Sequence, residues 1–472
     1  MATNTKATAN PKNSVITIPK VAIKSSGPDL SKHPIANSIE TLISCVTDIA
    51  WALSVAVPHA QKTQIRFMRK LAARQRKNLE AIKKSNGSEQ AEAIAGVLET
   101  ARNVDMLLAS KMPDAIVRGL FIQLFCEFDN YTGNLIRSIA TLDESKFFHL
   151  KREITIGELK SLPTIDALKN DLLEKEIENL RRESYPKQFQ TLEKDYELTL
   201  TKFDEWTDFV EASQRRNLFT HVGGIVSDQY ISVCSANGSD SKKLKPKGSQ
   251  LSLSPEYFFR ACEVVEITGI MLGHTLWRRI FPAEHNLANS HLNHLVYEKL
   301  RTQNFRGALR LSEFGLSPVI TKQTSGVDRR IRVINKAIAL SRLNGSKSAT
   351  DYLNTEDWSD TLRDFSLARA VLEERYSDAA QIMRKIGKEG ELVTESAYRN
   401  WPLFFNFRKQ QEFLEAYLDV FGYSFGSTIT SDLPDADEVT TTANNKQSEA
   451  PKSAKSRAQP KKQKTTDTVL TQ

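Results

Sequence analysis

Residues 204–224 read DEWTDFVEASQRRNLFTHVGG, and this stretch predicts a helix that ends at a pair of glycines. No Gly or Pro interrupts it before His221, whereas Gly223 and Gly224 are typical of a helix stop. At about 100° per residue, one stripe of the helix contains, in order, Trp206, Val210, Ser213, Asn217 and His221. The stripe is apolar at first and becomes polar where burial should continue. Buried polar groups cost free energy unless they are hydrogen-bonded or used, so we place the candidate functional site here.

Three side chains in this stretch suit the cleavage of a phosphodiester in RNA. An arginine such as Arg216 can hold a phosphate with a planar fork of donors. A histidine such as His221 can both accept and donate a proton near neutral pH. The RNA supplies its own nucleophile as the 2′-hydroxyl. The sequence therefore predicts Arg216, Asn217 and His221 as catalytic residues, with Arg215 and Thr220 as residues that position the substrate.

Arg216 and His221 are five residues apart, so on an ideal helix their side chains point about 140° away from each other. One helix therefore cannot easily direct both side chains at the same phosphate. A second copy of the helix, packed across a two-fold axis, would bring Arg216 of one chain toward His221 of the other. A bent helix end is the alternative. The first arrangement predicts a homodimer with a composite site.

The pattern Arg-Asn-x-x-x-His, from Arg216 to His221, resembles the signature of HEPN-domain ribonucleases, in which a histidine follows an arginine after four to six residues. The segment GGIVSDQYI at 223–231 also resembles the RiboL-PSP-HEPN-like group, as do 172–180 and 188–194. The resemblance covers roughly residues 100 to 280. It implies an all-α bundle, usually dimeric, and a cleavage of RNA that needs no metal and leaves a 2′,3′-cyclic phosphate.

The resemblance also implies roles for single residues. Arg216 would neutralise the charge that develops on the phosphate, and His221 would serve as general base or acid. Asn217 is the polar neighbour that is common beside the arginine, and no cofactor or metal ion is required. Members act as toxins, anti-phage defence effectors or RNA-processing enzymes, so an antitoxin or a sensor protein is a candidate partner. The alternative function is a non-catalytic scaffold of HEPN and helical-repeat parts that binds protein or RNA.

A second amphipathic helix is predicted for residues 116–139, with this apolar stripe: Ile116, Leu120, Leu124, Phe128, Tyr131, Leu135 and Ile139. In HEPN domains an early helix packs on the motif helix and often contributes a polar residue near the site. Glu127, Asp129 and Asn134 are the candidates for that contribution. An ordinary solvated helix face explains the same residues equally well.

The net charge of +8 is unevenly distributed along the 472 residues. Residues 1–34 carry five lysines against one Asp, 62–84 carry nine Lys and Arg against one Glu, and 451–464 carry six positive charges and no acid. The rest of the chain is therefore acidic, at about −10, so a non-specific grip on nucleic acid must come from these three segments.

Within the second basic segment, apolar and neutral residues recur at spacings of three and four: Ile65, Met68, Ala72, Gln75, Leu79 and Ile82. This spacing predicts a helix or a helical hairpin with the basic residues on its other faces. The segment is interpreted either as a solvated helix or as an arm that follows an RNA backbone.

The length of the chain exceeds that of a single core, so several domains are expected. We divide it into a disordered N-terminus (1–36), a basic helical arm (37–95), a HEPN-like domain (96–285), a helical region (286–426) and a disordered basic tail (427–472). The fold class is all-α throughout. Similar segments at Asn304–Leu309 and Arg375–Ala380 place Phe305 and Tyr376 at about twice a tetratricopeptide (TPR) period, so the helical region is either TPR-like or a plain helical bundle.

The sequence also predicts three smaller features of the chain. Residues 230–253 are expected to form a loop or a weak hairpin, and Ser254 is expected to cap a helix that closes the domain near Phe281. His285, His291 and His294 are interpreted as a partly exposed helix start rather than as zinc ligands.

The cellular context is inferred from the cysteines and from hydropathy. Four scattered cysteines, Cys45, Cys126, Cys234 and Cys262, suit reduced thiols in the cytosol. No signal peptide is visible, and the longest apolar stretch, residues 42–57, is short and contains Asp48. The sequence therefore predicts a cytoplasmic protein without a membrane segment.

Overall fold

A computed structural model of the chain describes residues 33–146, 157, 164–359 and 361–428. The structure is 79% helical, and the described residues form no strands, which confirms the all-α class. Two isolated β-bridges, Ile225 with Gln250 and Glu389 with Thr394, are the extended pairings within these residues. The predicted disordered termini lie almost entirely outside the described residues, although α1 already begins at Pro34.

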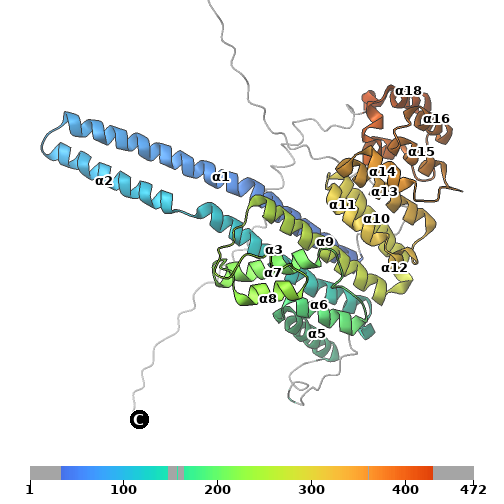
Figure 1. The fold of residues 1–472 in the computed structure, drawn as a ribbon, viewed down its shortest axis with the longest axis horizontal. Helices are drawn as coiled ribbons and strands as arrows, with labels where there is room; N and C mark the ends of the chain where they lie inside the picture. The colour runs from blue at the N-terminus through green and yellow to red at the C-terminus, as the bar shows by residue number, and fades with distance from the viewer. Residues whose placement is uncertain (1–32, 147–156, 158–163, 360, 429–472) are drawn as a thin grey trace, which may run out of the picture.

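The described helices fall into three regions, which Figure 1 shows as a projecting hairpin, a central bundle and a second helical body. The hairpin and bundle consist of α1 (Pro34–Lys84), α2 (Ser88–Ala109), α3 (Met112–Leu142), η2 (Glu144–Lys146), α5 (Ile165–Arg182), α6 (Tyr185–Tyr196), α7 (Trp206–His221), α8 (Asp228–Ala236) and α9 (Pro255–Ile280). The second body consists of η3 (Pro282–Glu284), α10 (His285–Arg301), α11 (Phe305–Gly315), α12 (Pro318–Thr321), α13 (Gly326–Asn344), α14 (Ser346–Leu353), α15 (Arg363–Leu372), α16 (Tyr376–Ile386), α17 (Glu395–Asn400), η4 (Pro402–Phe405), η5 (Phe407–Lys409), α18 (Gln411–Phe421) and η6 (Phe425–Thr428).

Helix α1 belongs to two of these regions. Its first half packs against α3 and α9, and it buries Leu42, Val46, Ile49 and Leu53, whose spacing of four, three and four residues places them on one face. Its second half leaves the bundle and pairs with α2 as an antiparallel hairpin (Figure 1). Only the second half of the predicted arm (37–95) belongs to the helical hairpin, because the first half packs into the bundle, and the predicted boundary at residue 95 falls inside α2.

The central core is formed where α1, α3 and α9 approach one another closely. Gly269 and Gly273 of α9 allow this approach, because a Cβ at Gly273 would lie 2.5 Å from Tyr131 Oη and 2.8 Å from Ile39 Cδ1. The Tyr131 hydroxyl donates a hydrogen bond to the carbonyl of Gly269 at 2.6 Å. Helix α7 lies on α3 and α9, and its Phe209 ring contacts Phe128 at 4.9 Å between centroids.

The segment after α7 corrects one expectation. Residues 228–236 form helix α8 rather than the loop or weak hairpin that the β-branched residues suggested. The Ser227 side chain caps this helix by accepting from Tyr230 N. Tyr230 and Cys234, four residues apart, are both buried in a small cluster with Leu218, so tertiary burial selects the helical spacing. The predicted start of α9 is confirmed, since Ser254 accepts from Tyr257 N at 3.2 Å.

The second body contains a local structural repeat. The turn between α10 and α11 places Gln303 at φ 61°, and the turn between α15 and α16 places Glu374 at φ 60°. Each of these left-handed residues lies one residue before the N-cap of the next helix, at the two sequence segments that resemble each other. Paired helices with the same turn geometry are consistent with helical-repeat units. The TPR-like assignment itself stays a prediction.

One part of α1 passes the length and composition test for a membrane span. An 18-residue window within this helix has a mean hydropathy of 1.6, and 22% of that window is buried. The core helix of a soluble protein passes the same test. The expectation that the chain has no membrane segment therefore stays a prediction.

The packing at Gly273 leads to a stability prediction with a matched control. We expect Gly273→Ala to lower the free energy of unfolding by about 1–3 kcal/mol, because the new Cβ overlaps Tyr131 and Ile39. Gly119→Ala, in α3, meets no atom within 4 Å and should raise stability by about 0.5–1 kcal/mol through helix propensity. Urea unfolding of both variants measures the difference, and a Gly273→Ala protein as stable as Gly119→Ala would contradict the close approach of these helices.

Candidate functional site

The candidate site lies where the C-terminal half of α7 emerges from the bundle. Ser213 is fully buried, Asn217 is half-buried and His221 is exposed, so the predicted stripe runs from core to solvent. The helix ends with Gly223 at φ 63° and Gly224 at φ 89°, conformations that favour glycine. The N–H groups of Val222 and Gly224 both donate to the carbonyl of Leu218 at 2.9 Å, which fixes the end of the helix.

Arg216 is anchored inside its own subunit by two polar groups from other helices. Its Nη2 donates to Tyr185 Oη at 3.0 Å, at the start of α6, and lies 3.5 Å from Asp129 Oδ2 on α3. The Arg216 and Asp129 side chains are each 21% exposed. The guanidinium also lies over the rings of Phe125 and Tyr185, at 5.6 and 5.7 Å. Its Nε is buried and makes no hydrogen bond within the described chain.

The Tyr185 hydroxyl links Arg216 to Asp129 by accepting from the first and donating to the second. Its hydrogen bond to Asp129 Oδ1 is 2.7 Å long. Burial and the neighbouring Asp129 raise the pKa of Tyr185 well above its ordinary value, so the hydroxyl keeps its proton. Burial also raises the pKa of Asp129, against the opposing effects of Tyr185, Arg216 and Arg181. The three groups form one polar cluster at the edge of the core.

His221 lies apart from this cluster in the same chain. It is exposed in the last turn of α7, and no hydrogen bond or ion pair involves it within the described residues. The helix offsets it from Arg216 by about 7.5 Å along the axis and about 140° around it. Asn217 likewise forms no hydrogen bond through its side chain in the described structure. The Thr220 hydroxyl donates to the carbonyl of Arg216 at 2.9 Å, so it is bound to its own helix.

Arg215 contacts a different set of residues from Arg216. Its Nε donates to Glu211 Oε1 at 2.9 Å, and its guanidinium lies 3.8 Å from the centre of the Tyr257 ring. Glu211 also accepts from the hydroxyls of Tyr230 and Tyr257, at 2.5 and 2.6 Å. The Arg215 and Glu211 side chains are only 16% and 15% exposed. Arg215 therefore joins α7, α8 and α9, and it also donates to the carbonyl of Ser252.

Of the three polar candidates on α3, only Asp129 lies at Arg216. Glu127 accepts from Gln123 and Asn130, and together with burial it raises the pKa of Cys45 on α1. Asn134 accepts from Arg137 Nη1 at 2.9 Å. These two residues therefore belong to other surfaces of α3. The candidate helix does pack on the motif helix, as expected.

Tyr185 is a residue of the cluster that the sequence alone did not reveal. It precedes Pro186 at the first position of α6, where a tyrosine has no special meaning. Arg181, which acts electrostatically on Asp129 and donates to Asn130, was missed for the same reason. Only the packing of α5 and α6 on α3 brings both residues to the motif.

One hollow beside α5 and α6, and the histidines near the start of α10, differ from the α7 site in their surroundings. A hollow of about 210 Å³ near α5 and α6 is lined by three acidic side chains, Glu176, Glu183 and Asp195, which repel phosphate. The interpretation of His291 as partly exposed is wrong, because it is 1% exposed and its Nδ1 lies 3.2 Å from Nε2 of the buried His274. Among the described residues, no group of three or more His, Cys, Asp or Glu side chains could hold a metal ion.

The environment of Arg215 predicts a loss of stability on substitution. We expect Arg215→Ala to lower the free energy of unfolding by about 2–4 kcal/mol, because Glu211 would stay largely buried without its cation. Arg182→Ala is the control, since its ion pair with Glu178 is on the surface and should contribute less than about 1 kcal/mol. Denaturant unfolding monitored by circular dichroism compares the two, and equal losses would remove the structural role of Arg215.

Comparison with known proteins adds no relative. The chain matches no protein-family model, and neither the curated proteins nor the solved structures contain a match. The interpretation of this site therefore depends on its residues and their geometry.

Proposed function

We propose that this protein is a metal-independent endoribonuclease of the HEPN type that acts as a homodimer. The observation that carries the proposal is the anchored but incompletely paired guanidinium of Arg216, on the same helix as the exposed His221. Neither side chain is enclosed within the subunit. A second chain or an RNA strand can therefore reach both.

The proposed reaction is an internal transesterification. A base removes the proton of the 2′-hydroxyl, and the oxygen attacks the adjacent phosphorus. A new P–O2′ bond forms, the P–O5′ bond breaks, and the leaving 5′-oxygen takes up a proton. The products are a 2′,3′-cyclic phosphate and a 5′-hydroxyl end, with no change in oxidation state. In this scheme His221 transfers a proton, and Arg216 stabilises the negative charge that develops on the phosphate oxygens.

Asp129 and Tyr185 act as positioning residues in this proposal. They hold one edge of the guanidinium through Nη2 and leave Nε without a protein partner. The Arg216 side chain is 21% exposed although its Nε is buried, so a phosphate oxygen would approach the exposed part of the guanidinium. An arginine held in place before the substrate binds loses less conformational entropy on binding, which favours stabilisation of the transition state.

The second chain is needed because of the angle between the two catalytic side chains. Arg216 points toward α3 and α6 of its own subunit, whereas His221 points to solvent about 140° away. Two copies related by a two-fold axis can place Arg216 of one protomer beside His221 of its partner. Each dimer would then contain two equivalent sites.

The rest of the chain fits this proposal as follows. Helices α3 and α5–α9 would form the HEPN bundle, and α10–α18 would form a TPR-like region that binds an antitoxin or a sensor protein. The cytoplasm is the proposed location, with cellular RNA as the substrate of a toxin or an anti-phage effector.

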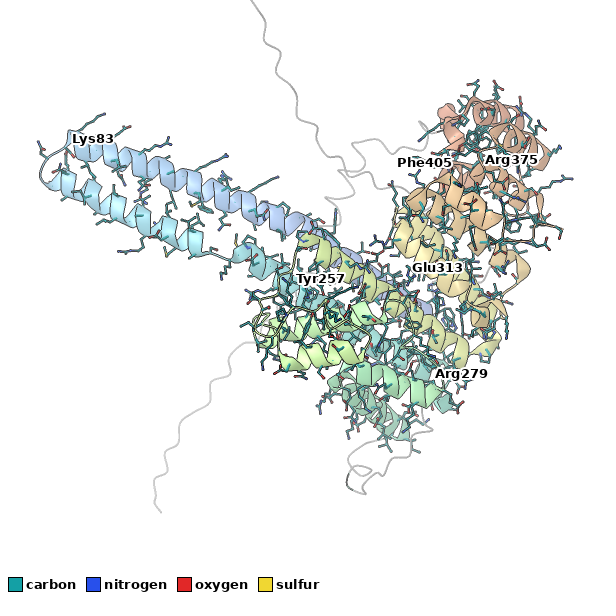
Figure 2. All side chains as sticks on the ribbon, in the orientation of Figure 1. Lys83, Tyr257, Arg279, Glu313, Arg375 and Phe405 are labelled. Carbon is teal, nitrogen blue, oxygen red and sulfur yellow. The ribbon has the colours of Figure 1, made fainter. Side chains whose placement is uncertain are left out.

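Substitution of the two catalytic residues tests the proposal directly. With RNA in the presence of EDTA, we expect His221→Ala to reduce cleavage by about 10²–10⁴-fold and Arg216→Ala by about 10²–10³-fold. Matched controls are His294→Ala, an exposed histidine on α10, and Arg279→Ala at the far end of α9, and both should retain activity (Figure 2). The readout is the formation of 2′,3′-cyclic phosphate ends, which a 2′-O-methylated RNA cannot form.

Mixing the two inactive variants tests the composite site. A heterodimer of Arg216→Ala and His221→Ala retains one intact pair, so random exchange should restore about a quarter of the wild-type activity. Equal cleavage by the wild type and both variants would indicate a contaminating nuclease and overturn the assignment. No cleavage by the wild type on any RNA would favour the non-catalytic scaffold.

Tyr185→Phe tests the positioning role. We expect kcat to fall by about 10-fold or more with little change in KM, because the guanidinium loses its fixed position while RNA contacts elsewhere remain. The free energy of unfolding should fall by only about 1–2 kcal/mol. If the tyrosine is merely structural, kcat per folded molecule will be unchanged.

A further inference from the structure

The projecting part of the α1–α2 hairpin carries an apolar face that nothing in the described chain covers. On α1, Ile65, Ala72 and Leu79 recur every seven residues, and all three are exposed, with Ile65 at 53% and Leu79 at 46%. On α2, Ile94, Leu98 and Leu108 are 46%, 63% and 67% exposed, with the half-buried Ala101 between them. The spacing of seven on α1, and the spacings of four and three from Ile94 to Ala101 on α2, occur in coiled-coil seams, although the next seam position on α2 is Asp105.

Both stripes lie on the same face of the hairpin. On each helix, the stripe lies about 90° around the helix axis from the side that contacts the other helix. On both helices this rotation has the same sense, which is the direction of increasing residue number. Because α1 and α2 are antiparallel, the same sense of displacement on both helices leads to one common face. The ion pair between Arg74 and Glu99 lies on the opposite face.

The hairpin buries little by itself. Beyond the bundle, its buried residues are Ala60, Ala93 and Thr100, all of them small. Two helices in water gain most of their stability from packing an apolar face against another element, and here that face is left open. A four-helix bundle, formed when a second hairpin packs on it, would bury these residues with the usual seam geometry.

The charges on α1 and α2 favour a second copy of the chain as the partner and favour one direction of packing. Residues 62–84 of α1 carry a net charge of +8, whereas α2 carries Glu89, Glu92, Glu99 and Asp105 against Arg102, a net charge of −3. Two copies packed with their tips in the same direction place α1 of one chain against α2 of the other. Copies packed with their tips in opposite directions place one basic α1 against another. Electrostatic complementarity favours the first arrangement.

We propose that the hairpins of two copies of this chain pack face to face, tips in the same direction, as an antiparallel four-helix bundle that holds the protein as a dimer. The partner is thus a second copy of the same chain, and the surface is the one formed by the stripes on α1 and α2.

This arrangement places the two bundles side by side at the base of the hairpins. Figure 2 shows Tyr257 at the base of the hairpin and Lys83 at its tip. The guanidinium of Arg215 lies 3.8 Å from the Tyr257 ring, so the motif end of α7 lies at that base. Hairpins joined with their tips in the same direction therefore bring the two motif helices to the same end of the dimer. Dimer formation itself does not depend on the proposed ribonuclease activity.

The oligomeric state of the full chain tests the proposal, with controls matched for exposure. Light scattering should give the wild type a mass of twice 53.2 kDa. Ile65→Glu and Leu98→Glu should each weaken the dimer at least 10-fold. Phe67→Glu and Met106→Glu introduce the same charge at residues that are 53% and 60% exposed but lie outside the stripes, so these proteins should remain dimeric. Circular dichroism verifies that each variant keeps its helices.

A distance between spin labels tests the direction of packing. With Lys84→Cys labelled at the tip, and Cys45 and Cys126 replaced by serine, hairpins that point the same way should give an inter-label distance of about 25 Å. Opposite directions should give about 40 Å or more, because each projecting α1 is about 35 Å long.

A monomeric wild type, or equal dissociation of stripe and control variants, would overturn the dimer proposal. A dimer that the stripe substitutions leave intact, with cleavage that depends on Arg216 and His221, would refute this surface while leaving the proposed function standing. A dimer that depends on the stripes but cleaves no RNA would support this surface and refute the proposed function. Loss of RNA binding by the stripe variants without a change in mass would identify the face as an RNA contact instead.

Discussion

The close approach of α1, α3 and α9 is the constraint on which the rest of the structure depends. Because Gly269 and Gly273 have no side chain, Leu42 and Ile39 of α1 and Tyr131 of α3 pack directly against the backbone of α9. Helix α7 then rests on the surface that α3 and α9 form together. Because α1 is continuous from Pro34 to Lys84, the same packing also fixes the direction in which its second half leaves the bundle. The orientation of the motif helix and that of the hairpin therefore have one origin.

The polar cluster of Arg216, Tyr185 and Asp129 shows how side chains at the edge of the core can hold a charged group in position for a ligand. Burial alone would favour a neutral Asp129, yet Tyr185, Arg216 and Arg181 all favour its ionised form. The arginine gains a fixed position from this balance without being fully paired. A fully paired arginine would have less to gain from a phosphate, and an exposed one would lose more entropy on binding. Arg216 in the proposed ribonuclease lies between these two extremes, because it is held in position but is not fully paired.

Neighbouring residues in the motif have different roles for a geometric reason. Arg215 and Arg216 are adjacent, so on a helix they point about 100° apart. One meets Glu211 and Tyr257, which join α7 to α8 and α9. The other meets Tyr185 and Asp129 from α6 and α3. The motif in the sequence selects Arg216 as the catalytic candidate and leaves Arg215 as a residue that positions the substrate. The surroundings show instead that Arg215 joins α7 to α8 and α9.

The sequence by itself determined the helices with strong signals: the 204–221 run with its glycine stop, the cap at Ser254, and the spacings of three and four from Ile65 to Ile82. These features are local, because helix spacing and capping depend on residues within one or two turns of each other. Tertiary structure alone decided that residues 228–236 are helical, that Asp129 and not Glu127 or Asn134 meets Arg216, and that Tyr185 lies between them. Such outcomes depend on which helix faces pack together across long sequence separations, and no local pattern encodes that choice.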